Sequence, residues 1–226
     1  MDRGIRGKNA LVCGASRGLG KACALALARE GVNITIVARN RDVLENTGGE
    51  IERLTGAAIA IVAADLATKD GRAAAISACP RPDILVNNSQ GPSPGNFREW
   101  SREDWLAALD DMMLGPIEMM RLTVDGMMER GFGRIVNIVS RSVKIPQIEL
   151  GIERRTAQYR HIRGMLTGTN KTFEELYRER ADASPAKRYG DPAELGAYCA
   201  FLCSSRSGYI TGQSLLIDGG SYPGTF

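Results

Sequence analysis

Short apolar runs alternate with longer amphipathic stretches along most of the chain. Strands that alternate with helices are typical of a parallel sheet covered by helices. The run 34–37, Ile-Thr-Ile-Val, is almost wholly apolar, as expected of a strand buried on both faces. The pattern therefore predicts an α/β fold, a doubly wound parallel sheet in one domain over residues 1–226. We expect strands at 10–13, 33–38, 58–63, 84–87, 134–139 and 214–217, and helices at 18–30, 41–54, 69–78, 102–130 and 192–203.

Composition narrows the function classes. A chain of 226 residues, 43% hydrophobic and 24% charged, has the balance of one globular domain. Its net charge of +3 is too small to favour nucleic acid, and no apolar stretch is long enough to span a bilayer. The first residues show no secretory signal, so we expect a cytoplasmic protein. The 5 cysteines lack metal-ligand spacing and predict buried thiols rather than a metal site.

A glycine-rich turn, Gly14-Ala-Ser-Arg-Gly-Leu-Gly20, follows the first expected strand and opens the first expected helix. Glycine permits a tight turn and lets a pyrophosphate approach the backbone closely, and a helix start attracts that anion. Strand, turn and helix in this order predict a dinucleotide site of Rossmann type. A chance glycine loop is the alternative. The predicted cofactor contacts in this turn are Gly14, Ser16, Arg17, Gly18, Leu19 and Gly20.

Two arginines bear on the choice of dinucleotide. The second expected strand ends at Arg39, where an acidic residue would hold a ribose 2′-hydroxyl. Arg39 and Arg17 can instead bind a 2′-phosphate in bidentate fashion, which favours NADP(H) over NAD(H). The alternative is that both are solvated surface arginines.

The spacing Gly-x-x-x-Gly-x-Gly resembles the short-chain dehydrogenase/reductase family, and in particular its 3-oxoacyl-carrier-protein reductases. Residues 5–145 and 185–220 carry the resemblance, which includes Asn87-Asn-Ser89 and Ile217-Asp-Gly-Gly220. The resemblance implies that Asp65, beside Leu66, accepts a hydrogen bond from the adenine, although Asp65 could equally cap a helix. It implies that Asn87 stabilises the sheet near the adenosine, next to Ser89, and that Ser140 is the catalytic serine.

The rest of the family's catalytic tetrad is absent from its expected places. Met112 aligns with the family's Asn, and the register of its Tyr falls near Glu153. No tyrosine has a lysine four positions later; Tyr159 has Arg163 there, in a context unlike the family's. The comparison with the family predicts that a helix and strand of about thirty residues, the size such a pair needs, are missing between about residues 150 and 152. 

Three explanations compete for this gap: residues of the molecule that the sequence omits, a deletion, or divergence of the tetrad. We favour the first, because removing a central strand would open the core and expose a sheet edge.

The resemblance implies an oxidoreductase that reduces a ketone or 3-oxoacyl carbonyl with NADP(H), or oxidises the alcohol. It also implies a homo-oligomer, dimer or tetramer, that pairs through 102–130 and 214–217. A long segment at 154–183 follows the place of the family's substrate lid and hints at a bulky substrate; a plain surface helix pair is the alternative. His161 has no predicted role. If the sequence is complete, we expect a catalytically impaired protein that binds NADP(H) as a sensor or scaffold.

Overall fold

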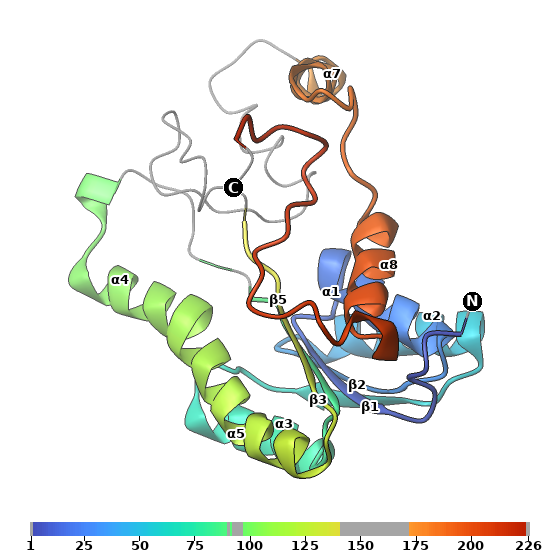
Figure 1. Cartoon of the computed structure of the whole chain (residues 1–226). Helices are drawn as coiled ribbons and strands as arrows, with labels where there is room; N and C mark the ends of the chain where they lie inside the picture. Colours follow the sequence, from blue (N-terminus) through green and yellow to red (C-terminus); the bar gives the residue numbers. More distant parts are fainter. Residues whose placement is uncertain (1, 90, 92–96, 141–171, 225–226) are drawn as a thin grey trace.

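Five parallel strands form the centre of the structure, a computed structural model that describes residues 2–89, 91, 97–140 and 172–224 (Figure 1). The strands are β1 (Asn9–Cys13), β2 (Asn33–Ala38), β3 (Ile59–Ala63), β4 (Ile84–Asn87) and β5 (Arg134–Asn137). Their order in the sheet is β3-β2-β1-β4-β5, so β1 lies at the centre with β2 and β4 beside it. The predicted doubly wound α/β fold is confirmed.

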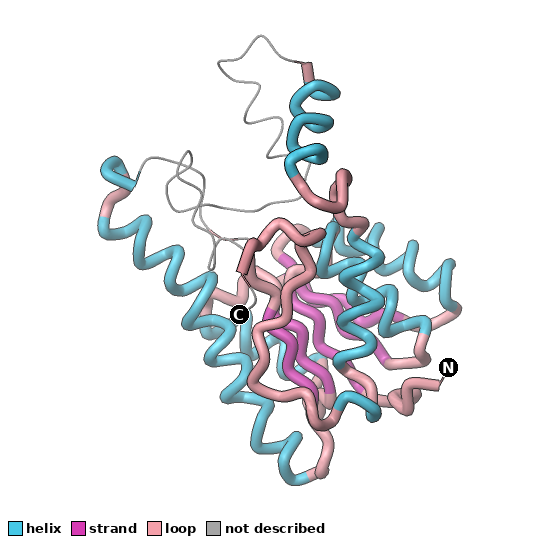
Figure 2. Tube along the Cα trace, turned by 45° about the horizontal axis from the view of Figure 1, so that its top comes forward, coloured by secondary structure: helices cyan, strands magenta, loops and turns pink. Residues whose placement is uncertain are grey.

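Helices cover both faces of this sheet (Figure 2). On one face, α1 (Gly18–Arg29), α2 (Arg41–Thr55) and α8 (Pro192–Leu202) pack on side chains such as Val12 and Ile36. On the other, α3 (Lys69–Ala78) and α5 (Gly115–Glu129) pack on Leu11 and Leu85. Neighbouring strand residues point to opposite faces, so the apolar strands supply both cores.

The register places the carboxyl ends of the strands along one edge. Val12 pairs with Ile36 on one side and with Val86 on the other, and Asn87 pairs with Asn137 on β5. The loops that leave these strands therefore emerge together, which is where doubly wound sheets bind their ligands.

The long helix predicted over 102–130 is interrupted. It consists of α4 (Arg102–Leu109), a π-helical turn η2 (Asp110–Leu114) and α5. Pro116 has no N–H to continue the α-helical ladder, and the N–H of Gly115 donates to the carbonyl of Asp110, five residues earlier. A proline near the start of α5 thus accounts for the change of pitch.

The strand predicted at 214–217 is wrong, because this segment forms no strand in the structure. A strand requires a paired neighbour, and within the described residues the sheet ends at β5. Leu216 is 41% exposed, and β5 is itself only half-buried whereas β4 is fully buried. The apolar residues of 214–217 are therefore left partly exposed, because no described strand lies beside β5 to pair with them.

The C-terminal part contains α7 (Phe173–Ala183), α8 and a short turn η5 (Ser205–Ser207); a similar turn, η1 (Phe97–Glu99), precedes α4. The predicted start of α8 is confirmed: Asp191 and Glu194 form a capping box and Pro192 is the first helical residue. Across the described segments, no helix combines the length and the apolar character needed to cross a membrane.

Candidate dinucleotide-binding and active site

The glycine turn lies where the chain passes from β1 to α1, against the loop that follows β4. Gly14 has φ 60° and Gly18 has φ 59°, in the left-handed region that favours glycine. A Cβ on Gly14 would collide with the carbonyl oxygen of Asn88, and one on Gly20 would lie 2.9 Å from the Asn88 Nδ2 and collide with the Gly14 carbonyl. Glycine is therefore required for different reasons at the three positions. Gly14 has both a positive φ and a close backbone contact, Gly18 has only the positive φ, and Gly20 has only the close contact.

The start of α1 has no cap from its own chain. The N-cap residue Arg17 makes no side-chain hydrogen bond to the helix, and the first turn contains no acidic residue. The starts of α2, α3, α4, α7 and α8 are each capped by a side chain, from Asn40, Thr68, Ser101, Thr172 and Asp191 respectively. The first N–H groups of α1 and the positive end of its dipole are thus available to an anion.

Polar contacts hold this turn in place. The Asn88 Nδ2 donates to the Gly14 carbonyl at 3.0 Å, and the Thr47 Oγ1 donates to the Ser16 carbonyl at 2.7 Å. Neither support was predicted: Asn88 lies within the Asn-Asn-Ser motif that we quoted, but Thr47 sits in an amphipathic helix with no distinguishing signal. These two hydrogen bonds satisfy carbonyls of the turn and fix its backbone.

Asn87 joins two strands at the edge of the sheet where the glycine turn lies. It is 4% exposed, and its Nδ2 donates to the Asn137 Oδ1 at 2.8 Å, which joins the ends of β4 and β5. The Cys13 thiol contacts the Asn87 Oδ1 at 3.8 Å, and burial raises the pKa of that thiol to about 12. Cys13 therefore packs as a small uncharged side chain. Ser89, half-buried, follows in the same loop.

The two predicted 2′-phosphate ligands lie at this edge of the sheet. Arg39 follows β2 and Arg17 is in the glycine turn, and both are exposed. No carboxylate stands at the end of β2, where Ala38 is followed by Arg39 and Asn40. This arrangement has donors for a phosphate and lacks the acceptor that a ribose 2′-hydroxyl would use.

Asp65 does not cap α3, so that alternative is wrong. Thr68 is the N-cap residue, and its Oγ1 accepts from the Gly71 N–H at 3.0 Å. The Asp65 Oδ1 accepts from the Ala67 N–H at 3.0 Å, which shapes the turn after β3. Asp65 and Leu66 are half-buried in this turn, at the same edge as the glycine turn.

Ser140 lies beyond the end of β5, on the same edge, and is half-buried. Met112, in the family's Asn position, lies in the π-helical turn and is 49% exposed. The Asp111 carboxylate accepts from the Gly91 N–H at 3.0 Å, which ties that turn to the loop after β4. This tie was not predicted, since it depends on the π-helical pitch. Glu153, Tyr159 and His161 lie outside the described residues, as does much of the segment 154–183.

The described end of that segment has an aromatic surface. Phe173 stacks on Tyr177 with ring centroids 6.1 Å apart, and Tyr177 contacts Tyr189 at 4.6 Å. A hollow of about 470 Å³ lies beside them, with Arg178 and Lys187 among its lining residues. Glu174 and Asp182 also line it, so its aromatic area is surrounded by charges of both signs.

Sequence and structure comparisons show which proteins this chain is similar to. A sequence model described as "short chain dehydrogenase" matches residues 8–152, and one described as "Enoyl-(Acyl carrier protein) reductase" matches residues 161–222. The NADPH-dependent reductase BacG of Bacillus subtilis is 28% identical over 252 residues, covering 95% of this chain and 97% of BacG. The 3-oxoacyl-[acyl-carrier-protein] reductase FabG of Staphylococcus epidermidis is 27% identical over 241 residues, covering 95% of this chain and 99% of FabG.

A solved structure of L-sorbose reductase from Gluconobacter frateurii, complexed with NADPH and L-sorbose, superposes with a TM-score of 0.90 at 27% identity and covers 98% of both chains. Both sequence alignments are longer than the 226 residues of this chain, so BacG and FabG contain positions that have no counterpart in it. The family model over residues 8–152 covers more than half of the chain. The chain therefore belongs to the short-chain dehydrogenase/reductase family.

Proposed function

We propose that this protein is an NADP(H)-dependent oxidoreductase that reduces the carbonyl of a ketone or 3-oxoacyl substrate, or oxidises the corresponding alcohol. The cofactor is NADP(H), in agreement with the NADPH-dependent relatives. The observation that carries the proposal is the uncapped start of α1 directly after a turn in which Gly14 and Gly18 have positive φ and Gly20 packs closely on the Gly14 carbonyl. This arrangement suits a pyrophosphate.

Each proposed cofactor contact follows from where the residue lies along the edge of the sheet. Gly14, Ser16, Gly18, Leu19 and Gly20 would surround the pyrophosphate at the start of α1. Arg17 and Arg39 would hold the 2′-phosphate by charge-assisted hydrogen bonds. The turn with Asp65 and Leu66 would meet the adenine, and the loop with Asn87 and Ser89 would lie beside the adenosine.

Ser140 would act on the substrate. Its hydroxyl can donate to the carbonyl oxygen and stabilise the negative charge that develops there. The bound NADPH would supply the hydride to the carbonyl carbon. The reaction also needs a proton donor near that oxygen, and among the described residues no Tyr is followed four positions later by Lys.

A second candidate function rests on the absence of this proton donor from the described residues. Met112 cannot make the hydrogen bonds of the amide that the family has in its place. If the sequence is complete, the protein would retain an NADP(H) site with little catalysis, as a sensor or scaffold. The positions of BacG and FabG that this chain lacks support a missing block, which we place near residue 150.

Intact mass and activity separate the two functions. A mass near 24.4 kDa means that the sequence is complete; a mass roughly 3 kDa larger means that a block of about thirty residues is present in the molecule, given the size of a helix–strand pair. NADPH consumption is then measured against a panel of ketones and 3-oxoacyl thioesters. The complete 226-residue chain should show no appreciable turnover, since loss of a positioned proton donor costs about 10²–10⁴-fold.

The Ser140→Ala variant is the control. If the molecule contains the missing block, wild type should turn over and Ser140→Ala should lose most of that activity. Robust turnover by a chain of verified mass 24.4 kDa would contradict the impaired alternative. Turnover that Ser140→Ala leaves intact would contradict the role of Ser140.

We also propose that the protein forms a homo-oligomer through α4 and α5. Large apolar side chains are exposed along these helices and along 214–217: Leu106, Leu109, Met113, Ile117, Leu122, Leu215 and Ile217. Apolar patches of this kind mark association surfaces. Light scattering at micromolar concentration should report a dimer or tetramer, and a monomer would count against the proposal.

A further inference from the structure

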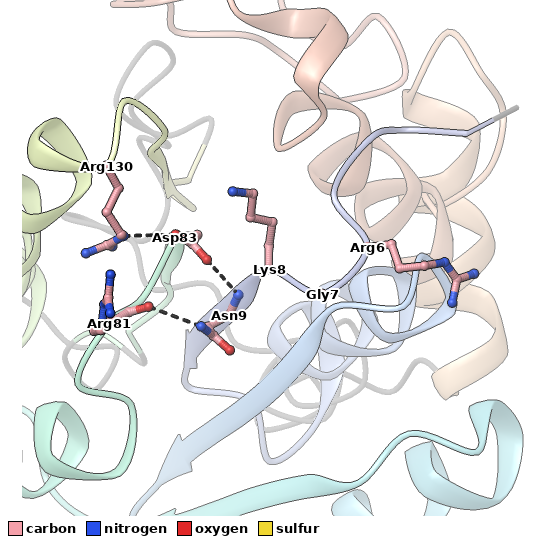
Figure 3. Close-up of a pocket in the computed structure, with 7 residues that line it drawn as sticks. All are labelled: Arg6, Gly7, Lys8, Asn9, Arg81, Asp83 and Arg130. Carbon is pink, nitrogen blue, oxygen red and sulfur yellow. Dashed lines mark hydrogen bonds and ion pairs between the residues drawn. The ribbon is translucent and has the colours of Figure 1, made fainter.

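A second polar pocket lies at the opposite edge of the sheet from the glycine turn, where the strands begin (Figure 3). It has a volume of about 350 Å³ and is lined by Arg6, Gly7, Lys8, Asn9, Arg81, Asp83 and Arg130. We call it the basal pocket. Four of its residues are cationic and one is acidic, whereas the whole chain carries only +3. Positive charge is thus concentrated in a place that the proposed function does not use.

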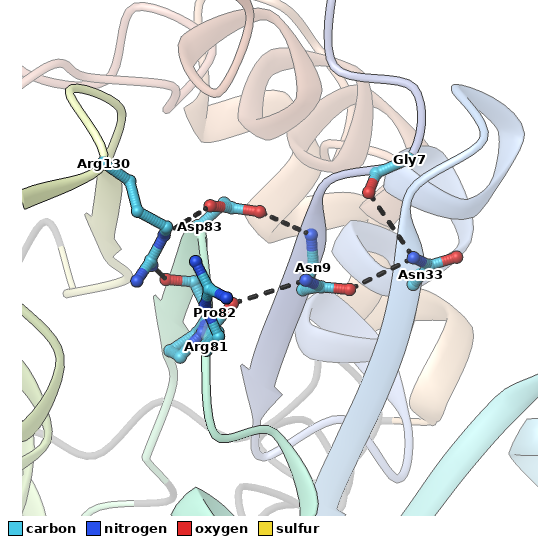
Figure 4. Close-up of polar contacts among 7 residues, drawn as sticks. All are labelled: Gly7, Asn9, Asn33, Arg81, Pro82, Asp83 and Arg130. Atoms are coloured by element: carbon cyan, nitrogen blue, oxygen red, sulfur yellow. Dashed lines mark hydrogen bonds and ion pairs between the residues drawn. The ribbon is translucent and has the colours of Figure 1, made fainter. Parts of the chain in front are cut away.

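The single carboxylate of the basal pocket is already engaged. Asp83 is 7% exposed, accepts from the Asn9 N–H at 3.0 Å and from the Arg130 Nε at 3.2 Å (Figure 4). The Arg130 Nη2 donates to the Pro82 carbonyl at 2.7 Å. These bonds fix the guanidinium of Arg130 and leave Asp83 with little capacity to neutralise other cations.

Three further cations line the pocket: Arg6, Lys8 and Arg81. In the described residues, no carboxylate pairs with Lys8 or Arg81; the Lys8 ammonium lies 4.4 Å from the centre of the Phe132 ring. The backbone of Arg81 is held in place, because its carbonyl accepts from the Asn9 Nδ2 at 3.4 Å. Figure 3 shows Arg81 and Arg130 on one side of the pocket with Lys8 beside Asp83, while Arg6 is directed away from them.

Helix dipoles explain only part of this charge. Cations are favourable at helix C-termini; Arg130 follows the end of α5, and Arg81 lies three residues after the end of α3. Lys8, which precedes β1, follows no helix. Cations that line one pocket with a single carboxylate among them repel one another, and a bound anion would reduce that repulsion.

We propose that the basal pocket binds a small phosphorylated molecule whose phosphate carries at least two negative charges. Lys8, Arg81 and Arg130 would be the ligands, with the guanidinium groups donating in bidentate fashion to phosphate oxygens. The volume lies within the range of small-molecule sites, so a phosphate with a small organic group fits better than a bare ion. The site is distinct from the cofactor site, which lies at the other end of β1.

The test uses inorganic pyrophosphate as the probe, with isothermal titration calorimetry and thermal unfolding at constant ionic strength. We expect binding that Lys8→Gln and Arg81→Gln each weaken by at least 10-fold, and an increase in Tm of roughly 5 °C at saturation that KCl does not reproduce. Arg81→Lys should restore part of the affinity. Arg53→Gln, at an exposed position of α2 that does not line the pocket, removes the same charge and should leave binding unchanged.

Gly20→Ala decides between the two edges of the sheet, because it alters the turn that would surround the cofactor's pyrophosphate. If pyrophosphate binds in the cofactor site instead, Gly20→Ala weakens binding and Arg81→Gln does not, which overturns the proposal. Equal weakening by Arg53→Gln and Arg81→Gln would mean attraction by net charge only and overturns it as well. So does an absence of binding at millimolar pyrophosphate. Lys8 and Arg81 are not ligands of NADP(H) in the proposed function, so these results do not depend on it.

Discussion

Alanine substitutions at four glycines separate the two reasons for glycine in the turn. Gly14 has a positive φ and its Cβ would collide with the Asn88 carbonyl; Gly18 has a positive φ with nothing within 4 Å; Gly20 has only the collision. Gly49, an exposed residue within α2, has neither. The four variants therefore test the positive φ alone (Gly18), the close contact alone (Gly20), both together (Gly14) and neither (Gly49).

The structure gives the expected order of stability. A left-handed φ costs a non-glycine residue about 1–2 kcal/mol, and an overpacked contact costs about 1–3 kcal/mol. Gly18→Ala should lower the free energy of unfolding by about 1–2 kcal/mol, Gly20→Ala by about 1–3, and Gly14→Ala by about 2–5. Gly49→Ala should raise it by about 0.5–1 kcal/mol, because alanine is the better helix former.

Urea unfolding followed by circular dichroism measures these differences, and NADPH titration measures the effect on the site. Gly14→Ala and Gly20→Ala should lose most NADPH affinity, because both move the backbone that would surround the pyrophosphate. Gly49→Ala should bind as wild type does. If Gly14→Ala were no more destabilising than Gly18→Ala, the close approach between the turn and Asn88 would not be what requires glycine there.

Three further predictions concern the cofactor, pH and the thiols. Arg39→Ala should weaken NADPH binding about 10–30-fold, for a charge-assisted contact of about 2 kcal/mol, and leave NADH binding unchanged; equal wild-type affinities for the two would refute this. The Arg188 guanidinium lowers the pKa of Glu194 to about 2. The Glu194 carboxylate, which takes part in the capping box of α8, therefore stays charged above that pH and becomes protonated as the pH falls through about 2. Carbon-13 NMR of the carboxyl should show this midpoint, and Arg188→Gln should raise it. The thiols are all buried, so native protein should react with a disulfide reagent only as fast as it unfolds; rapid labelling would contradict the packing.

The sequence predicted the parts of the fold that depend on local pattern. β1, β2 and β4 are apolar runs between turn signals, and α8 starts at a capping Asp followed by Pro. The glycine turn was predictable because its geometry follows from residues that are adjacent in the chain. Asp65 shows the limit of such reasoning, since two helix-start residues, Asp65 and Thr68, compete and only the folded turn decides between them.

Other features depend on contacts between distant segments. The pattern at 214–217 has the composition of a strand, but a strand exists only beside a partner, and periodicity does not report partners. The π-helical turn before Pro116 and the tie from Asp111 to Gly91 depend on helix pitch and on the loop after β4. The basal pocket joins residues from three separate parts of the chain, so no single motif marks it.

The central place of β1 in the sheet has a consequence for how the protein folds during synthesis. β1 can pair with β2, and β2 with β3, as soon as the N-terminal third has left the ribosome. The other edge of β1 stays open until β4 emerges, because Asp83, the partner of Asn9, lies 74 residues later. During that interval a largely buried, apolar strand presents an unpaired edge, a state prone to association with other chains. The time needed to translate α2 and α3 therefore sets how long the nascent chain can associate wrongly with other chains. Substitutions that slow the translation of this segment should lower the yield of soluble protein without changing the stability of the folded protein.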